Sequence, residues 1–434
     1  MTSEILLDVL DALKRRGLSE AEVFHKRGRS RTLRLEGSVP ITSLRQEEGW
    51  AVRAGNHDGS FFYTASGSPR PDAPWPEPTG RALRLPSARP VPTWAPPMDL
   101  DAPLLGENEA VHLLNGVSRA LTDELPGARL VRAYLEDGAG DQELASSREI
   151  EARSRLRAAS LFLEARGPNR DDPSISVLLA EREARRFLPK TVARHLADRL
   201  LLSTRGAPRN RDRGDLLLSH GVVAPLLAAL SPLWIGPRAP SVVRDLCDQG
   251  RLAARGFTLV DDGRHPRGIL QAPVDGEGLP TRRVVLVEEG MYRQPLVSWR
   301  QATPRMQASG CSRRFGWRDL PDPGPTHLYL ESASTTGVGE LLSSLSRGYY
   351  LLSTHGSVKV EAGFSRFAVP VSGFAIEGGR PTGSISGTWL VGTVSAFLKG
   401  LVAAARDLTF TPLGGGMIGA PTLLVKGLEL RHRL

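Results

Sequence analysis

The sequence predicts an α+β protein with two domains, an N-terminal one over residues 1–205 and a C-terminal one over residues 206–434. Two observations support this prediction. The chain opens with an amphipathic helix followed by short alternating strands, and glycine-separated strand candidates dominate its second half. A helix followed by such strands covers one face of an antiparallel sheet. The second half suits a β-rich, barrel- or sandwich-like domain with flanking helices.

The first domain is expected to begin with a helix over residues 3–16, where apolar residues recur at helical spacing and Gly17 ends the repeat. Alternating apolar and polar residues then predict a series of short strands, and two later apolar stripes predict two more helices. The strands are expected at 21–25, 31–36, 49–54, 60–65, 129–136, 149–153, 158–165 and 174–180, and the helices at 107–125 and 191–202.

Residues 68–103 form a proline-rich connection within the first domain. Prolines recur from Pro69 to Pro103, and each lacks the backbone donor that a helix interior or a central strand requires. We interpret this stretch as an exposed, semi-extended linker. The alternative is a proline-rich ligand segment for a partner.

The second domain begins after a polar, arginine-rich stretch near residue 205. Short apolar runs between glycines predict its strands, and apolar stripes predict its helices, the last of which is interrupted at Gly400. The strands are expected at 215–219, 284–287, 326–330, 350–353, 358–361 and 422–425, and the helices at 222–230, 340–346 and 390–405.

The overall charge and the cysteine content limit the class of protein. The net charge is +9, but arginines alternate with acids along the chain instead of forming one basic stripe, so nucleic-acid binding is not favoured. We interpret the arginines as solvated surface, with an acidic partner as the alternative. The two cysteines cannot form a disulfide framework, and no apolar run is long enough to cross a membrane. A cytoplasmic protein without a membrane partner is expected.

Several segments of the second domain occur in a recognisable order. They are Ala-Pro-Val-Asp-Gly-Glu-Gly-Leu-Pro-Thr-Arg (272–282), Val-Glu-Glu-Gly-Met-Tyr (287–292), Ser-Gly-Phe-Ala-Ile-Glu-Gly-Gly (372–379), Gly-Ser-Ile-Ser-Gly-Thr-Trp-Leu-Val-Gly (383–392), Ala-Arg-Asp-Leu (405–408) and Gly-Ala-Pro-Thr-Leu-Leu-Val-Lys-Gly-Leu (419–428). Together they resemble the C-terminal half of the TldD/PmbA family, also called the TldD/TldE metallopeptidases. An older label for this family is modulator of DNA gyrase. The resemblance covers residues 273–434 well and the N-terminal half only loosely.

The resemblance implies that peptidase members hold zinc through a His-Glu-x-x-x-His helix and a late cysteine. At the comparable place this chain has His220, but Gly221 replaces the glutamate, Pro225 replaces the second histidine, and the stretch 411–419 contains no cysteine. Zinc catalysis needs several such ligands and a carboxylate base. We therefore expect no catalytic residue, metal ligand or cofactor in this chain, and zinc only in a TldD-type partner. His220 is interpreted as a capping or buried hydrogen-bonding residue.

Two segments are candidates for a peptide groove. Asp275 and Glu277 flank Gly276, and they either bind a hard cation through oxygen ligands or close a tight turn by accepting backbone amides. The second segment offers small residues along a strand edge, to which an extended peptide can add as a further strand. The candidate groove residues are Asp275, Glu277, Gly278, Phe374, Ile376, Ser384, Ser386 and Gly387.

The resemblance and the missing ligands together predict a non-catalytic, TldE/PmbA-like subunit of a TldD/TldE-type zinc metallopeptidase. Such a subunit forms a heterodimer with a TldD-type chain and lines a chamber for unfolded or short peptides. The alternative is a homodimeric peptide-binding or scaffold protein without peptidase activity. A third possibility is an independent hydrolase that uses Asp275, Glu277 and His265. A fourth is a nucleic-acid binder, which rests on the net charge alone.

Overall fold

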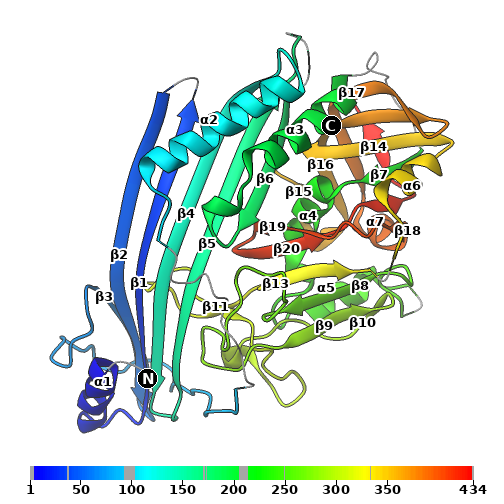
Figure 1. Cartoon of the computed structure of the whole chain (residues 1–434). Helices are drawn as coiled ribbons and strands as arrows, with labels where there is room; N and C mark the ends of the chain where they lie inside the picture. The colour runs from blue at the N-terminus through cyan, green and yellow to red at the C-terminus, as the bar shows by residue number, and fades with distance from the viewer. Residues whose placement is uncertain are drawn as a thin grey trace.

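The computed structural model describes residues 4–36, 39–91, 103–169, 172, 174–204, 214–248, 250–332 and 334–432. Its N-terminal half is one antiparallel sheet of six strands in the order β3-β2-β1-β4-β5-β6 (Figure 1). The strands are β1 (Glu20–Glu36), β2 (Val39–Asn56), β3 (Gly59–Ser66), β4 (Arg129–Ser146), β5 (Glu151–Arg166) and β6 (Ser174–Glu181).

The strands β1, β2, β4 and β5 are much longer than the sequence pattern predicts, while β3 and β6 match it to within one residue at each end. The expected strands 21–25 and 31–36 are two ends of the 17-residue β1, and the expected strands 149–153 and 158–165 both fall within β5, which begins only at Glu151. Polar residues and glycine interrupt the alternation at the middle of β1. Backbone pairing continues there on both sides, with Gly28 opposite Glu47 and Gly140, because the ladder hydrogen bonds do not depend on side chains.

Three helices cover one face of this sheet: α1 (Glu4–Arg15), α2 (Glu107–Glu124) and α3 (Pro189–Thr204). α1 lies at the lower end of the strands in Figure 1, while α2 and α3 lie toward the upper end. Burial alternates strictly along β5. Its odd-numbered residues from Arg157 to Ala165 are buried and its even-numbered residues are only half-buried. Leu161 and Leu163 pack in one core with residues of α2 and α3. The even-numbered positions face the C-terminal half.

The described part of the proline-rich stretch, residues 68–91, forms neither a helix nor a strand, yet it is more than an exposed linker. The ring of Trp75 packs edge-on against Trp50 and Tyr63, with centroids 5.6 and 5.4 Å apart. The amide of Leu85 donates to Glu20 Oε2 over 3.2 Å. The segment therefore crosses the end of the sheet and buries its apolar side chains there. Pro92, Pro96 and Pro97 lie outside the described residues.

The C-terminal half contains two larger sheets. One has six strands in the order β10-β9-β8-β13-β20-β19, and the other has eight, ordered β18-β21-β7-β14-β16-β17-β22 with β15 paired to β16. The strands are β7 (Asp215–Leu218), β8 (Thr258–Asp262), β9 (Arg283–Glu288), β10 (Met291–Tyr292), β11 (Ser312–Arg313), β12 (Asp322–Pro323), β13 (His327–Glu331), β14 (Arg347–Thr354), β15 (Lys359–Val360), β16 (Arg366–Glu377), β17 (Arg380–Thr393), β18 (Leu401–Ala404), β19 (Thr409–Leu413), β20 (Gly416–Ala420), β21 (Leu423–Val425) and β22 (Glu429–Arg431). The helices are α4 (His220–Ala229), α5 (Ala239–Leu246), α6 (Val338–Ser343) and α7 (Val394–Lys399).

This architecture confirms the α+β fold class, with a helix-covered antiparallel sheet followed by a β-rich half. One predicted element is wrong. The expected helix 390–405 is the end of β17, the short helix α7 and the strand β18. A Cβ on Gly400 would lie 2.1 Å from the carbonyl oxygen of Lys426. The backbone at Gly400 therefore packs directly against Lys426, the residue that follows β21, and the helix ends there.

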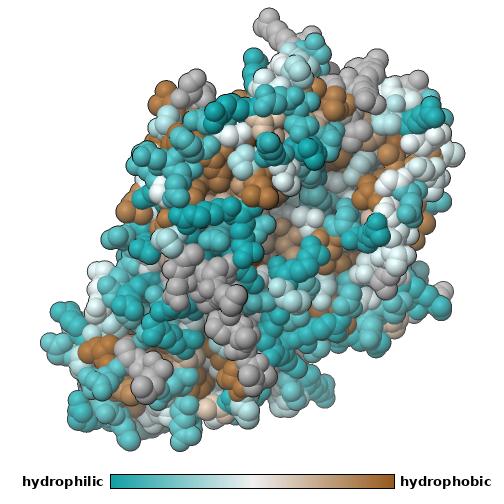
Figure 2. All heavy atoms as spheres, viewed as in Figure 1, coloured by the Kyte–Doolittle hydropathy of each residue, from teal (hydrophilic) through white to brown (hydrophobic). Residues whose placement is uncertain are grey.

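The face shown in Figure 2 is mostly hydrophilic, with hydrophobic residues in small separate groups. Within the described residues, no helix is both long enough and apolar enough to cross a membrane.

Candidate functional site

Asp275 closes the turn that carries the Asp-Gly-Glu-Gly signature. Its Oδ1 accepts the amides of Glu277 and Leu279 at 2.9 and 3.0 Å, and its Oδ2 accepts the amide of Ser312 at 3.0 Å. Burial, and then the charge of Glu277, raise the pKa of Asp275. Both oxygens of Asp275 therefore accept hydrogen bonds from backbone amides. Of the two alternatives for this residue, the geometry favours the tight turn over the cation site.

Glu277 joins the signature turn to its surroundings. Its Oε2 accepts the amide of Trp299 at 2.7 Å and the hydroxyl of Ser312 at 2.6 Å. Its Oε1 lies 3.9 Å from Nη1 of Arg53, on β2 of the N-terminal sheet. The signature thus contacts both halves of the chain.

A buried ion cluster completes this junction. Arg53 donates to both oxygens of Glu22 at 3.0 and 2.6 Å, and Arg314 forms an ion pair with the same carboxylate. Arg314 also donates from Nε to the carbonyl of Gly276 at 2.8 Å. Burial alone would raise the pKa of Glu22, but the charges of Arg53 and Arg314 outweigh it and lower this pKa. The cluster fixes the signature turn against the sheet.

Gly278 is required at this junction for two reasons. Its φ of +81° lies in the left-handed region that favours glycine. A Cβ there would also lie 2.5 Å from Cγ2 of Ile150. Close packing of the signature on the start of β5 therefore excludes a side chain.

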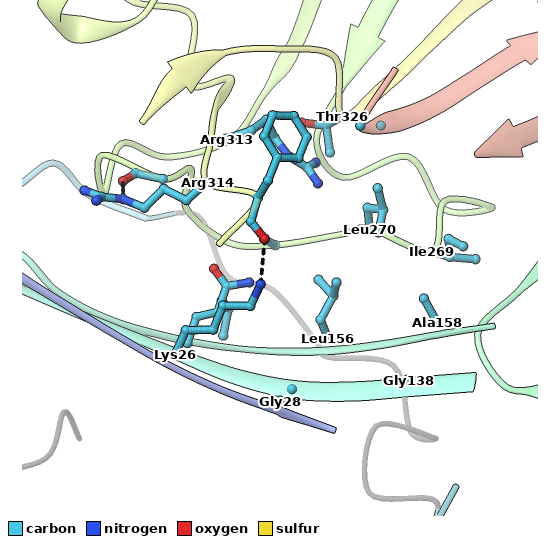
Figure 3. A pocket seen from close by; sticks show the side chains of 18 of the residues that line it. Lys26, Gly28, Gly138, Leu156, Ala158, Ile269, Leu270, Arg313, Arg314 and Thr326 are labelled. Atoms are coloured by element: carbon cyan, nitrogen blue, oxygen red, sulfur yellow. Dashed lines mark hydrogen bonds between the residues drawn. The ribbon is translucent and has the colours of Figure 1, made fainter. Parts of the chain in front are cut away.

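A cavity of about 610 Å³, here called the sheet cleft, lies between the sheet and the signature region (Figure 3). Its floor is formed by the inner face of the sheet, including Gly28, Gly138 and Leu156, and its walls by residues 269–276, 312–315 and 412–417. Lys26 donates from Nζ to the carbonyl of Phe315 at 2.8 Å across the cleft. The volume of the sheet cleft falls in the range typical of small-ligand sites.

A second cavity of about 500 Å³, here called the His220 cavity, lies farther along the same face of the sheet. It is lined by the start of α4, by β6, by the end of β14 and by Thr411 and Leu413. His220, Gly221 and Pro225 all line it. The positions that the family resemblance assigns to the metal site therefore converge in one cavity.

The cation beside His220 is the guanidinium of Arg199, on α3. Its Nη2 lies 3.2 Å from Nε2 of His220, and its Nη1 donates to the carbonyl of Leu352 at 3.2 Å. A guanidinium has donors only, so Nε2 accepts and the proton of the neutral ring lies on Nδ1. Burial, and then the charge of Arg199, lower the pKa of His220 to about 3. The ring of His195 stacks on His220 with centroids 6.4 Å apart, and burial lowers its pKa to about 4.

These residues do not fit a zinc ion. A zinc ligand would need the Nε2 lone pair of His220, which already accepts from Arg199. Gly221 and Pro225 have no donor atoms in their side chains, and no group of three His, Cys, Asp or Glu suited to a metal occurs in the described part of the chain. His220 is instead a half-buried hydrogen-bonding residue at the start of α4, where Ser219 is the N-cap.

Sequence reasoning missed Arg199. The predicted helix 191–202 has an inward stripe that includes Leu196 and Leu200, and residue 199 lies on the same face at a spacing of three from Leu196. Arg199 is buried, with 7% of its surface exposed. The sequence signal that could have identified Arg199 is a charged residue within the apolar stripe of a predicted helix.

The remaining groove candidates lie in a different sheet. Phe374 and Ile376 are fully buried on β16, which pairs with β14 and β17 on its two sides. These two residues therefore do not form an exposed edge, and they line neither cavity. Ser384, Ser386 and Gly387 lie on β17, which pairs with β22 only from Trp389 to Val391. Among the described residues, no further strand pairs with β17 on this side over Ser384–Gly387.

Comparisons with known proteins agree with this geometry. Residues 213–432, just over half of the chain, match the model of the PmbA/TldA metallopeptidase C-terminal domain. This match defines the class of the fold as metallopeptidase-like. The chain belongs to the TldD/PmbA family.

Individual relatives are distant. TldE from Thermococcus kodakarensis has a TM-score of 0.86 at 17% identity, covering 98% of this chain and 99% of that one. A proposed modulator of a DNA gyrase from Thermotoga maritima has a TM-score of 0.84 at 15% identity, covering 99% of both chains. A metalloprotease TldD homologue from Haemophilus influenzae is 27% identical over 209 residues, which span 46% of this chain and 40% of that protein.

The ion cluster predicts a large effect of removing the Glu22 carboxylate that Arg53 and Arg314 share. Glu22→Gln leaves two buried guanidinium groups without their main partner, and we expect the free energy of unfolding to fall by about 3–5 kcal/mol. Chemical denaturation measures this. The control is Glu331→Gln, which breaks an exposed pair with Arg283 and should cost less than about 1 kcal/mol. Equal losses in the two variants would contradict a special role for the cluster.

The lowered pKa of His220 predicts a pH-dependent stability. The folded pKa is about 3 against 6.5 for an exposed histidine, so its stabilising contribution is complete above pH 6.5 and is lost as the pH falls. His220→Gln keeps an acceptor for Arg199. We expect it to reduce the slope of unfolding free energy below pH 6.5 by up to about 1.4 kcal/mol per pH unit. His57→Gln, at an exposed histidine, is the control, and an identical slope in both variants would refute the assignment.

Proposed function

We propose that this chain is the non-catalytic, TldE/PmbA-like subunit of a two-subunit zinc metallopeptidase. In this proposal a TldD-type partner supplies zinc, its ligands and the catalytic glutamate, while this chain holds unfolded or short peptide beside the partner's site. The observation that carries the proposal is the contact of Arg199 with Nε2 of His220.

That contact argues against a metal in this chain on electrostatic grounds. Arg199 remains protonated at any physiological pH, and the described residues place no carboxylate within 4 Å of its guanidinium. Glu164, which also lines the cavity, forms an ion pair with Arg132, with Nη2 and Oε2 2.6 Å apart. A divalent cation at His220 would therefore meet a fixed positive charge in a largely buried site, where such repulsion is strong.

The arrangement of the cavities supports peptide binding. Successive inward positions of β5 line first one cavity and then the other: Ser154, Leu156, Ala158 and Ser160 line the sheet cleft, and Phe162 and Glu164 line the His220 cavity. Leu413 lines both. The path from Ser154 to Glu164 is roughly 33 Å long at about 3.3 Å per residue, which suits an extended chain.

Strand β6 offers a way of holding such a chain. It is the last strand of its sheet and pairs with β5 alone among the described residues, and residues 174–179 line the His220 cavity. An extended peptide can add to such an edge through main-chain hydrogen bonds, without a requirement for particular side chains. This would favour unfolded substrates over folded ones.

Co-expression with a TldD-type chain from the same organism tests the proposal. We expect the two chains to co-elute in size-exclusion chromatography, and the complex to cleave an unstructured peptide in a chelator-sensitive reaction. The control complex carries a partner whose zinc-motif glutamate is replaced by glutamine, and it should assemble without activity.

The isolated chain should show no cleavage under the same conditions. Failure to co-elute, with this chain eluting as a homodimer that binds peptide, would replace the proposal with the peptide-binding scaffold alternative. Chelator-sensitive cleavage by the isolated chain would overturn it.

A further inference from the structure

Arg313 and Arg314 are adjacent but differ in their surroundings. The guanidinium of Arg314 donates to Gly276 and pairs with Glu22. The side chain of Arg313 has no hydrogen-bond or ion-pair partner within the described residues, although it is largely buried. It lines the sheet cleft, and Figure 3 shows its guanidinium next to Thr326 and above the space over Leu156. Arg313 is therefore an uncompensated positive charge facing a cavity.

The nearest acid does not neutralise this charge by contact. Asp261 attracts Arg313, but the two groups are not within ion-pair distance. Oδ1 of Asp261 accepts the amide of Thr326 at 2.8 Å. Burial raises the pKa of Asp261 to about 7, so this carboxyl is protonated in a substantial fraction of molecules at neutral pH. A buried charge without a partner costs free energy that an anionic ligand would recover.

The rest of the cleft is apolar and open. Leu156, Ile269 and Leu270 lie around the space below Arg313 (Figure 3). A Cβ on Gly28 would meet no atom closer than 3.8 Å, and one on Gly138 none closer than 3.5 Å. Packing within the protein therefore does not require glycine at these positions. Side chains there would instead fill the cleft.

These features select one kind of ligand. The unpaired guanidinium of Arg313 matches the planar, two-oxygen geometry of a carboxylate. The other cations that line the cleft differ from it: Lys26 donates to Phe315, Arg45 and Arg314 form ion pairs, and Arg29 is exposed. The apolar floor suits a hydrophobic group attached to that carboxylate. The shared inward face of β5 and Leu413 connects the cleft to the His220 cavity.

We propose that the sheet cleft binds the C-terminal end of a peptide, with the terminal carboxylate on Arg313 and the last side chain over Leu156, Ile269 and Leu270. The peptide then runs along β5 toward the His220 cavity. This inference rests on the proposed peptide-holding function and adds a polarity to it: the chain recognises a free C-terminus.

Fluorescence anisotropy with two labelled peptides tests this polarity. Both are unstructured, about ten residues long to span the path along β5, carry the fluorophore at the N-terminus and end in leucine. One ends in a free carboxylate and the other in an amide. We expect the amide to bind about ten- to hundredfold more weakly, since a charge-assisted hydrogen bond is lost.

Three variants test whether the charge of Arg313 and the open space of the cleft cause the preference for the free acid. Arg313→Gln should bind both peptides equally and weakly, and its thermal midpoint without peptide should be unchanged or raised, because an unpaired buried charge is removed. Gly138→Val should weaken binding of the free acid by filling the cleft while leaving the charge in place. Arg318→Gln changes an exposed arginine nearby that does not line the cleft, and it should preserve the discrimination.

The possible failures are distinguishable. If the wild-type chain binds the acid and the amide equally, the Arg313 assignment is wrong and the peptide-holding function stands. If the wild-type chain binds neither peptide, both are wrong. If Arg318→Gln removes the discrimination as fully as Arg313→Gln does, general surface charge explains the result and the assignment is overturned.

Discussion

The paired charges of Glu22, Arg53 and Arg314 are the interaction on which the arrangement of the two halves depends. A carboxylate on β1 is bound by guanidinium groups from β2 and from the chain that follows β11. Arg314 also bonds the carbonyl of Gly276, so the signature turn is held against the sheet. Because this docking places the signature region and β19 over the inner face of β5, it creates both cavities. A buried ion cluster is costly unless its groups are well bonded, and here it specifies one docking geometry.

Within that arrangement, one arginine changes what the family's metal position can do. Arg199 comes from α3, outside the segment that resembles the zinc motif, and it donates toward the imidazole nitrogen that a metal would use. At this position the chain therefore lacks the glutamate and second histidine that the resemblance implies, and it also carries a fixed positive charge beside the remaining histidine. Arg313 provides a second charge along the same face of the sheet. Arg199 and Arg313 thus bring positive charge to the two cavities, and among the described residues neither guanidinium forms an ion pair with a carboxylate.

The sequence was sufficient for the fold class and the helices α1 to α4, because each has a strong local signal, whereas it left two alternatives open at Asp275. Strand lengths were not predictable. The middle of β1 lacks alternation around Gly28, since these positions face a cleft and not a core. The stretch that forms β16 and β17 was predicted only as a strand edge, without its hairpin pairing, and the helix expected at 390–405 overlooked the close approach at Gly400. The contacts of Arg199 and the unpaired state of Arg313 could not be predicted, because both depend on how elements far apart in the chain pack together.

The most direct test of the account is the zinc content of the isolated chain, purified with added zinc, dialysed and measured by elemental analysis alongside the His220→Gln variant. The account predicts substoichiometric zinc in both, with no difference between them, because the Nε2 lone pair of His220 is occupied by Arg199. Stoichiometric zinc in the wild-type chain that is lost in His220→Gln would contradict it.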